Sequence, residues 1–289
     1  MTEGQNFTRR YHDVRLLSQG GMGAVYRAID IRLGVAVAIK ENGIADPEMR
    51  AAFRREAQLL ANLRHHSLPI CIDFMEVNGG QFLVMEFIEG DDLATAMVNA
   101  RAPLSNATVK EMARQLLDVI QYLHEEGVQH RDIKCRNLKF VNGRLYLLDF
   151  GIAYGASGEM ETVGVGEGKG KYSSKRYSPP EQLKGGKVGP SGDLYSVAAT
   201  LFYATTNVQP ADAEERLESL ASGGKDPLED VRIYNRLADE RMSRAIMLAL
   251  SLRPEDRPQS AAELREMMFP RVYTPPKAAG VRRFLTLRL

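Results

Sequence analysis

The sequence predicts an α+β protein of two lobes, in which a small antiparallel sheet with one key helix precedes a larger, mainly helical lobe. Short apolar runs separated by turn residues fill positions 11–86, and one helical pattern interrupts them. After Gly90 the apolar patterns become helical. The chain has 289 residues, of which 44% are hydrophobic and 26% charged, so a large core can form.

The strand-like runs of the first lobe are short, and turn residues separate them. The strongest turn signal is Asn78-Gly79-Gly80, which predicts a hairpin between the last two runs. The runs lie at 14–17, 24–29, 35–40, 70–77 and 82–85. Together they predict a small sheet.

One amphipathic helix is predicted at 47–63, between the third and fourth strand-like runs. Apolar residues recur there at three- and four-residue steps, while arginine and glutamate occupy the other face. The apolar positions are Met49, Phe53, Ala57, Leu60 and Leu63.

The second lobe is predicted to be helical, with apolar helices at 107–126, 194–205 and 242–252. Two short strands, 138–141 and 145–148, are joined by Asn142-Gly143, a strong two-residue hairpin turn. The segment 155–175 is rich in glycine and poor in large apolar residues, which predicts a mobile functional loop.

Charge and cysteine usage exclude several classes of protein. A net charge of +1 gives no field that favours nucleic acid or an anionic membrane. Cys71 and Cys135 have no zinc-site spacing, and a reducing, cytoplasmic compartment without disulfides is expected. No apolar run is long enough for a signal peptide or a membrane span. The basic end, 270–289, predicts a tail or short helix, with a truncated juxtamembrane or regulatory segment as the alternative.

A glycine-rich segment lies between the first two strand-like runs and includes Ser18, Gly20, Gly21, Gly23 and Val25. A glycine hairpin can bring backbone N–H groups against phosphate oxygens because no side chains interfere. An ordinary turn is the alternative. Two other phosphate-binding motifs fit worse, since no helix pattern follows and no GxxxxGK[ST] occurs.

Lys40 ends the third strand-like run, Val37-Ala38-Ile39-Lys40. A lone ammonium on a buried strand is costly, and Glu56 on the predicted helix is its natural counter-ion. A pair of this kind can hold the α- and β-phosphates of a nucleotide. A solvated lysine, with Glu56 as one more surface charge, is the alternative.

The most specific pattern is His130-Arg131-Asp132-Ile133-Lys134-Cys135-Arg136-Asn137, followed by Asp149-Phe150-Gly151. Asp132 supplies a carboxylate that can orient an attacking hydroxyl. The amide oxygen of Asn137 and the carboxylate of Asp149 are hard ligands of the kind that Mg²⁺ prefers.

Taken in order, these motifs resemble the eukaryotic-type (Hanks-like) serine/threonine protein kinase family from about Tyr11 to Pro270. Pro179-Pro180-Glu181, Asp193 and Arg257 complete the set. Lys134 is typical of the serine/threonine branch, and residues 177–182 look closest to bacterial members. The resemblance implies a kinase N-lobe at 11–86 and a C-lobe at 87–270. It also implies a hinge at 86–90, an activation segment at 149–181, and tails at 1–10 and 271–289.

The resemblance also implies a role for each matching residue. Lys40, held by Glu56, would contact the α- and β-phosphates, Asp132 would accept or orient the substrate proton, and Lys134 would steady the γ-phosphate. The metal ligands would be Asn137 and Asp149, with Mg²⁺ as the ion and Mn²⁺ as the alternative. The structural residues would be Phe150, Glu181, Asp193 and Arg257. The ATP site would consist of Ser18, Gly20, Gly21, Gly23, Val25, Ala38, Lys40, Met85 as gatekeeper, and Glu86 and Ile88 in the hinge.

Four positions depart from the family pattern. Ser18 replaces the first loop glycine, which is expected to stiffen the loop, and Pro179 replaces an alanine without consequence. Cys135 replaces a proline and is expected to be a packed thiol, with an oxidation sensor as the alternative. Lys139 stands where an apolar residue usually floors the adenine pocket, so nucleotide preference or affinity is expected to change.

Arg131 next to Asp132 implies that a phosphorylated loop residue could be clamped by its guanidinium. The candidate phosphorylation sites are Thr162, Ser173 and Ser174. A loop that needs no phosphorylation is the alternative.

The resemblance implies transfer of the γ-phosphoryl group of Mg-ATP to serine or threonine of proteins, including the chain's own activation loop. A homodimer would be one route to that autophosphorylation. Nucleic acid is not expected as a partner, and no membrane segment is expected in this sequence. A longer native chain anchored to a membrane is left open. A pseudokinase and a small-molecule kinase are the alternatives. The pseudokinase is disfavoured because Lys40, Glu56, Asp132, Asn137 and Asp149 are all present.

Overall fold

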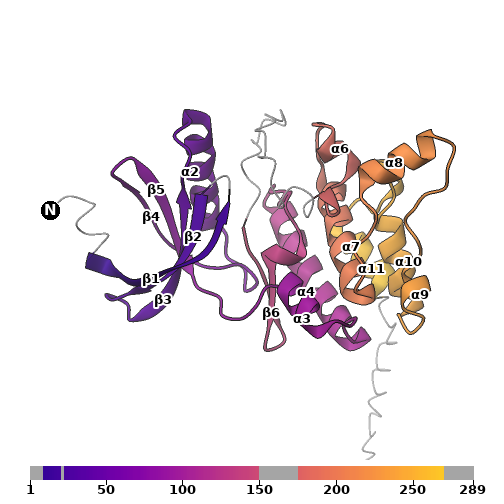
Figure 1. The fold of residues 1–289 in the computed structure, drawn as a ribbon, viewed down its shortest axis with the longest axis horizontal. Helices are drawn as coiled ribbons and strands as arrows, with labels where there is room; N and C mark the ends of the chain where they lie inside the picture. The colour runs from indigo at the N-terminus through magenta and orange to yellow at the C-terminus, as the bar shows by residue number, and fades with distance from the viewer. Residues whose placement is uncertain (1–8, 21–22, 150–174, 270–289) are drawn as a thin grey trace, which may run out of the picture.

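The computed structural model describes residues 9–20, 23–149 and 175–269, in which an antiparallel sheet precedes a helical part (Figure 1). Within these ranges the sheet has five strands in the order β1-β2-β3-β5-β4. Their bounds are β1 (Tyr11–Gly20), β2 (Gly23–Asp30), β3 (Val35–Asn42), β4 (Cys71–Val77) and β5 (Gly80–Glu86). The predicted two-lobed α+β class is confirmed.

Helix α2 (Pro47–Asn62) is the helix that the sequence predicted beside the sheet. Asp46 caps it by accepting hydrogen bonds from the N–H groups of Glu48 and Met49, and Pro47 suits its first turn. The apolar stripe is buried, and Glu56 lies on the same face. The helix therefore presents one carboxylate to the interior together with its hydrophobic side.

The two Asn-Gly turns adopt the conformation that their residues favour. Asn78 and Gly79 both have positive φ, 51° and 81°, and Asn142 and Gly143 follow with 51° and 78°. Two successive positive φ values match the right-handed twist of a hairpin, and asparagine and glycine tolerate them best. The second turn joins β6 (Leu138–Val141) to β7 (Arg144–Leu147), a small sheet between the five-stranded sheet and the helices (Figure 1).

The helical part contains the three predicted helices and several that the pattern did not indicate. The predicted ones are α4 (Asn106–Glu125), α7 (Pro190–Thr206) and α10 (Glu240–Ala249). The others are α3 (Leu93–Ala100), α6 (Pro180–Leu183), α8 (Ala213–Ala221), α9 (Val231–Tyr234), α11 (Ala261–Met268) and the 3-10 turns η1 (Cys135–Asn137) and η2 (Pro254–Asp256).

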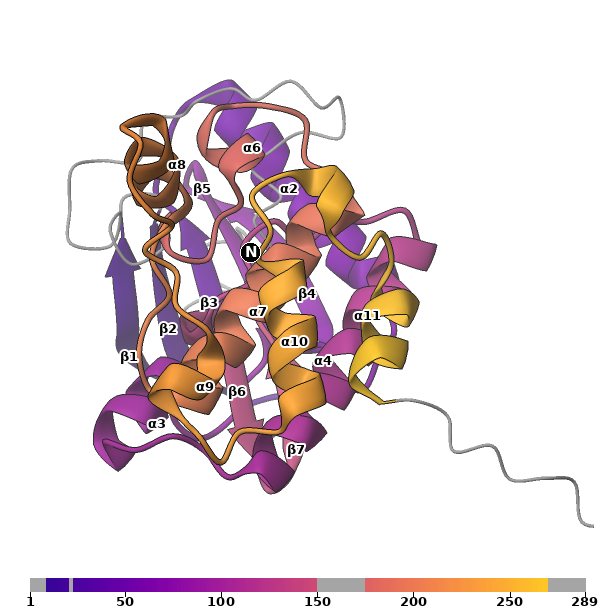
Figure 2. The ribbon, with the colours of Figure 1, turned by 90° about the vertical axis from the view of Figure 1, so that its right-hand side faces the viewer.

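Helix α7 forms the centre of the helical part, and Figure 2 shows other helices around it. It packs against α4, α9 and α10, and almost all of its residues are buried. Its polar residues Asp193 and Thr200 are therefore also inside, at 1% and 0% exposure. Because α7 is buried on every side, its apolar residues are not confined to one face, and its sequence shows no amphipathic stripe.

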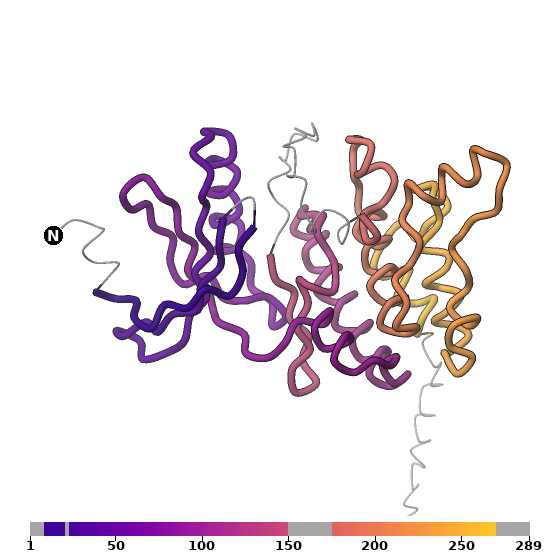
Figure 3. Tube along the Cα trace, viewed as in Figure 1, coloured from indigo at the N-terminus to yellow at the C-terminus, as the bar shows by residue number. Residues whose placement is uncertain are grey.

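Within the described ranges, the chain passes from the sheet to the helical part through the segment after β5 (Figure 3). One hydrophobic cluster nevertheless runs through both parts, because Leu60 of α2 and Met85 of β5 belong to the same core as Leu116 and Phe202 of the helices. No helix within the described ranges combines the length and the apolar character that crossing a membrane requires.

Candidate active site

The sheet side of the site is built on Lys40 of β3 and Glu56 of α2. Lys40 Nζ lies 2.7 Å from Glu56 Oε1 and 3.5 Å from Asp149 Oδ1. The Lys40 ammonium also lies 5.9 Å from the centre of the Phe53 ring. The glutamate side chain is 7% exposed, so α2 holds a buried ion pair against the sheet.

Lys40 stays protonated in this position. Burial lowers its pKa, but the carboxylates of Glu56 and Asp149 outweigh burial and the net pKa is raised. For Glu56, burial raises the pKa, because it disfavours the charged carboxylate, and the charge of Lys40 opposes that shift. Lys40 is thus a fixed cation, which Glu56 holds at 2.7 Å and which lies 3.5 Å from the Asp149 carboxylate.

The helical side of the site is built on the loop before η1. Lys134 Nζ donates to both carboxylate oxygens of Asp132, at 2.7 and 2.8 Å. Asn137 Nδ2 donates to the backbone carbonyl of Asp132 and to its Oδ2, both at 2.8 Å. The Asp132 carboxylate is 32% exposed, which leaves it accessible to a substrate hydroxyl.

Asn137 and Asp149 fit a hard divalent cation through the chemistry of their oxygens. Because the amide nitrogen of Asn137 bonds to Asp132, its amide oxygen is the atom available as a ligand. The same nitrogen approaches the backbone carbonyl of Asp149 at 3.4 Å, so the two residues are neighbours. The Asp149 side chain is 43% exposed, and carboxylate and amide oxygens suit Mg²⁺ and Mn²⁺.

Asp193 of α7 holds the loop that contains Asp132. It accepts hydrogen bonds from the backbone N–H groups of His130 and Arg131, at 2.9 and 2.8 Å, and His124 Nε2 lies 2.8 Å from it. Burial raises the pKa of Asp193, but these hydrogen bonds and the nearby histidines outweigh it, so the net pKa is lowered. Arg131 takes φ = 61°, an unfavourable angle that the anchor stabilises.

The glycine-rich turn joins β1 to β2. Ser18 pairs with Val25, and Gly20 pairs with Gly23. Gly23 has φ = 147°, and a Cβ there would lie 1.8 Å from the carbonyl oxygen of Glu41. Only glycine fits at this position, so the residue has a structural reason as well as the predicted phosphate-binding one.

The residues predicted to bind the adenine base lie on β3, on β5 and in the segment after β5. Ala38 is opposite Met85 in the sheet, and Val25 is opposite Lys40. Met85 and Ile88 are buried, while Glu86 accepts a hydrogen bond from the backbone N–H of Ile70. Directly opposite residues, and residues two apart on a strand, share a face of the sheet, so Val25, Ala38, Lys40 and Met85 lie on one face.

Glu181 of α6 forms an ion pair with Arg257, which follows η2. The Arg257 guanidinium donates to Glu181 Oε1 at 2.7 Å and to Oε2 at 2.9 Å. Gln182 donates to the backbone carbonyl of Arg131 at 2.8 Å, which joins α6 to the loop of Asp132. Gly21, Phe150, Thr162, Ser173 and Ser174 lie outside the described residues.

Two further side chains, His124 and Gln182, hold the loop of Asp132, and the sequence did not indicate this role. His124 follows the last apolar residue of the α4 stripe and looks like a surface residue of the final turn. The sequence feature that could have indicated it is Asp193, an aspartate within the apolar run of α7. A buried carboxylate needs hydrogen-bond donors from neighbouring elements. Gln182 carried no signal, because its partner is a backbone carbonyl of a distant loop.

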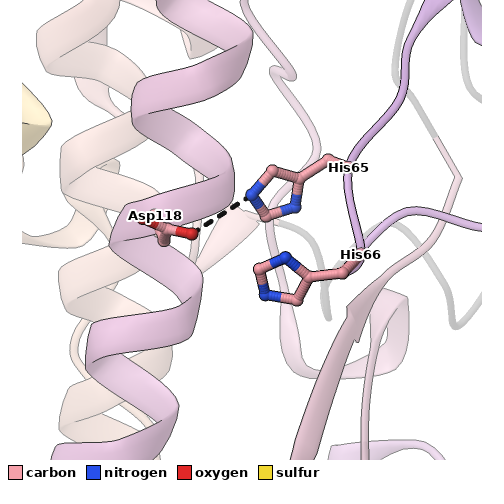
Figure 4. Close-up of side chains that lie close together, drawn as sticks. All are labelled: His65, His66 and Asp118. Atoms are coloured by element: carbon pink, nitrogen blue, oxygen red, sulfur yellow. Dashed lines mark hydrogen bonds and ion pairs between the residues drawn. The ribbon is translucent and has the colours of Figure 1, made fainter.

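A second polar cluster joins the sheet part to α4 (Figure 4). The potential ligand atoms of His65, His66 and Asp118 lie within 4.8 Å of one another. His65 Nδ1 accepts a hydrogen bond from the Ser67 N–H at 3.1 Å, so the proton of the neutral ring sits on Nε2, 3.2 Å from Asp118 Oδ2. In this tautomer Nε2 donates to Asp118 and is not a metal ligand.

Comparisons with known proteins agree with this geometry. Residues 11–269 match the family model described as protein kinase domain. A probable serine/threonine-protein kinase of Streptomyces coelicolor is 31% identical over 275 residues, covering 92% of this chain and 40% of that protein. Serine/threonine-protein kinase F of Synechocystis is 36% identical over 228 residues, covering 70% and 45%.

A solved structure described as PpkA-294 apo form is also similar, with a TM-score of 0.71 and 26% sequence identity. The alignment covers 88% of this chain and 94% of that one. The chain spans less than half the length of the two curated relatives above.

Proposed function

Since the chain belongs to the protein kinase family, we propose that it is a serine/threonine kinase that transfers the γ-phosphoryl group of ATP to protein hydroxyls. The proposal rests on one observation: two clusters of polar side chains, one from each lobe, lie next to each other. Lys40 with Glu56 comes from the sheet, Asp132 with Asn137 comes from the loop before η1, and Asp149 lies between them.

Asp132 would orient the substrate hydroxyl and take its proton. The hydroxyl oxygen forms a bond to the γ-phosphorus while the bond from that phosphorus to the β–γ bridging oxygen breaks, and ADP leaves. The charge on the transferring group is the main barrier, so cations placed around it lower the transition state. Lys134 can turn from Asp132 toward the γ-phosphate, and Lys40 would hold the α- and β-phosphates.

Asn137 and Asp149 would hold a divalent ion, Mg²⁺ before Mn²⁺, which neutralises phosphate charge when bound. Glycine at Gly20 and Gly23 leaves the backbone of the turn open to phosphate oxygens. The predicted base site, with Met85 as gatekeeper and Glu86 to Ile88 as hinge, supports ATP as the nucleotide.

The predicted lobe boundaries, 11–86 and 87–270, are proposed as the functional division, with 149–181 as the activation segment. Serine and threonine are favoured over tyrosine because Lys134 follows Asp132 by two residues. We place the protein in the cytoplasm, where ATP is present and the thiols of Cys71 and Cys135, both free, stay reduced.

Autophosphorylation at Thr162, Ser173 or Ser174 is proposed to proceed between two chains, with the Arg131 guanidinium clamping the new phosphate. Mixing the active chain with a longer, tagged Asp132→Asn chain tests this proposal. Phosphate on the inactive chain supports a homodimer encounter. Phosphate confined to the active chain points to transfer within one molecule.

The kinase proposal is tested by incubating the purified chain with Mg-ATP and a generic basic protein, and mapping the phosphate by mass spectrometry. Asp132→Asn removes the proposed base, and Asp256→Asn makes the same chemical change at an exposed position of η2. Transfer to serine or threonine is expected in the wild type and in Asp256→Asn, and is expected to vanish in Asp132→Asn. ATP binding without transfer in the wild type would favour a pseudokinase and refute the proposal.

A further inference from the structure

Gln81 of β5 is a buried polar side chain between the sheet and α2, with an exposure of 1%. Its Nε2 donates to the backbone carbonyl of Arg50 in α2 at 3.2 Å and to Glu76 Oε1 in β4 at 2.6 Å. Its Oε1 accepts from Asn42 Nδ2 of β3 at 2.9 Å. The Gln81 amide therefore joins the helix to three strands of the sheet.

The orientation of both amides follows from their partners. Asn42 Oδ1 accepts from the backbone N–H of Ile44 at 3.1 Å, so Nδ2 is the atom that Asn42 turns toward Gln81. Gln81 then receives this donor on its oxygen and points both N–H groups at acceptors. Moving such an amide is costly, because it would leave buried polar atoms unpaired.

These hydrogen bonds lie on the face of the sheet that carries Lys40. Asn42 follows Lys40 by two residues on β3 and is directly opposite Gln81, so the three side chains share one face. On α2, Arg50 precedes Glu56 by six residues, which is about 9 Å along a helix. The helix thus meets this face at two polar points. One is the hydrogen bond from Gln81 to Arg50, and the other is the Lys40 ion pair.

Two separate points fix the orientation of a helix, whereas one point does not. Apolar contacts have no preferred direction, so the buried stripe of α2 alone would let the helix turn on the sheet. The ion pair alone would act as a pivot, about which the first turn of α2 could swing. The hydrogen bond to Arg50 opposes this motion, because β5 holds its donor in the same sheet as Lys40.

We propose that Gln81 is a positioning residue for the reaction, which holds the first turn of α2 so that Glu56 stays on Lys40. The inference rests on the proposed function, because it assumes that Lys40 contacts the phosphates of the nucleotide. Gln81 acts through Glu56. A displacement of about 1 Å in a catalytic site can cost about 100-fold in rate, so a contact outside the site can decide the activity.

The test removes the Gln81 amide in two ways, by Gln81→Met, which keeps the length of the side chain, and by Gln81→Leu. Gln58→Met, at an exposed position of α2, is the matched control. Gln81→Met is also combined with Glu56→Ala. Each protein is assayed for kcat and for the KM of the protein substrate. Calorimetry gives the Kd for ADP and, through the stoichiometry, the fraction that binds nucleotide, while far-UV circular dichroism checks the fold.

We expect Gln81→Met and Gln81→Leu to lower kcat at least fivefold and to raise the Kd for ADP at least threefold. The KM of the protein substrate should stay within twofold, because the loop of Asp132 is unchanged. Gln58→Met should match the wild type. In the Glu56→Ala background, Gln81→Met should change kcat and the Kd for ADP by less than twofold, since the contact that it protects is already absent.

A purely structural role predicts a different pattern. Equal losses of kcat with and without Glu56 would overturn the inference, and so would a kcat within twofold of wild type in Gln81→Met. If one of the two Gln81 variants does not fold, the other decides. If neither folds, Gln81 supports the fold as a whole and the inference fails.

The ADP measurements separate this inference from the kinase proposal. If the wild type binds ADP but transfers no phosphate, the kinase proposal fails, while the Kd for ADP in the two backgrounds still decides the role of Gln81. If the wild type does not bind ADP, both proposals fail.

Discussion

Replacing Arg257 by methionine should strongly destabilise the helical part. The Arg257 side chain is fully buried, and Glu181 is 16% exposed. The guanidinium donates to both oxygens of Glu181 and to the backbone carbonyls of Ser191, Ser251 and Leu252. The substitution leaves a carboxylate and these carbonyls without their donor.

Removing one partner of a buried ion pair costs about 3–5 kcal/mol, because the other charge stays buried and uncompensated. Glu181→Gln should cost less, about 1–3 kcal/mol, since the amide oxygen still accepts from the guanidinium. A folded domain is stable by only about 5–15 kcal/mol in total. Arg257→Met therefore removes a large share of the stability, and the double variant should cost less than the sum of the two single changes.

Urea unfolding followed by far-UV circular dichroism measures these differences, because the helices dominate the signal. Arg253→Met, four residues before Arg257 and exposed, is the matched control and should change stability by less than about 0.5 kcal/mol. If Arg257→Met unfolds within about 1 kcal/mol of wild type at an unchanged slope, the buried pair does not hold the fold as argued.

Three further outcomes are expected. Burial raises the pKa of the Cys135 thiol to about 12, so iodoacetamide at pH 8 should label the half-buried Cys71 first and Cys135 only in urea, as mass spectrometry would show. Burial lowers the pKa of His65 and of His130 below 6.5. As the pH drops from 6.5, the unfolded state therefore binds protons before the folded state does, and the free energy of unfolding should fall. The loss is at most about 1.4 kcal/mol per pH unit for each histidine. His65→Asn should flatten that slope in urea titrations at several pH values. Leu117→Ala, at a fully buried position, should cost about 2–5 kcal/mol in the same titration.

The sequence predicted the fold best where local signals and burial agree. The stripe of α4 and the two Asn-Gly turns gave positions close to those observed, because periodicity and positive φ are local properties. Helices α6 and α9 have four residues each, too few to show a period. Their positions depend on tertiary packing, which a local pattern does not record.

The site was predictable in its residues but not in their connections. Lys40 and Asp132 were identified from motif order, yet the hydrogen bonds from His124 to Asp193 and from Lys139 to Ile88 join residues that are distant in the chain. A departure from the family pattern flagged Lys139. It did not reveal that the ammonium bonds to a backbone carbonyl.

Each half of the proposed site is built on elements of its own lobe, although one hydrophobic cluster spans both lobes. The sheet and α2 hold Lys40 and Glu56, and the Asp193 anchor in α7 holds the loop of Asp132 through backbone N–H groups. The contact of 3.5 Å between Lys40 Nζ and Asp149 Oδ1 joins the two halves. Because ion pairs weaken with distance, a small rotation of one lobe would break this contact and leave both rigid halves intact. Under the proposed function, such a rotation would separate Lys40 from Asp149, the aspartate that is proposed to hold the metal ion.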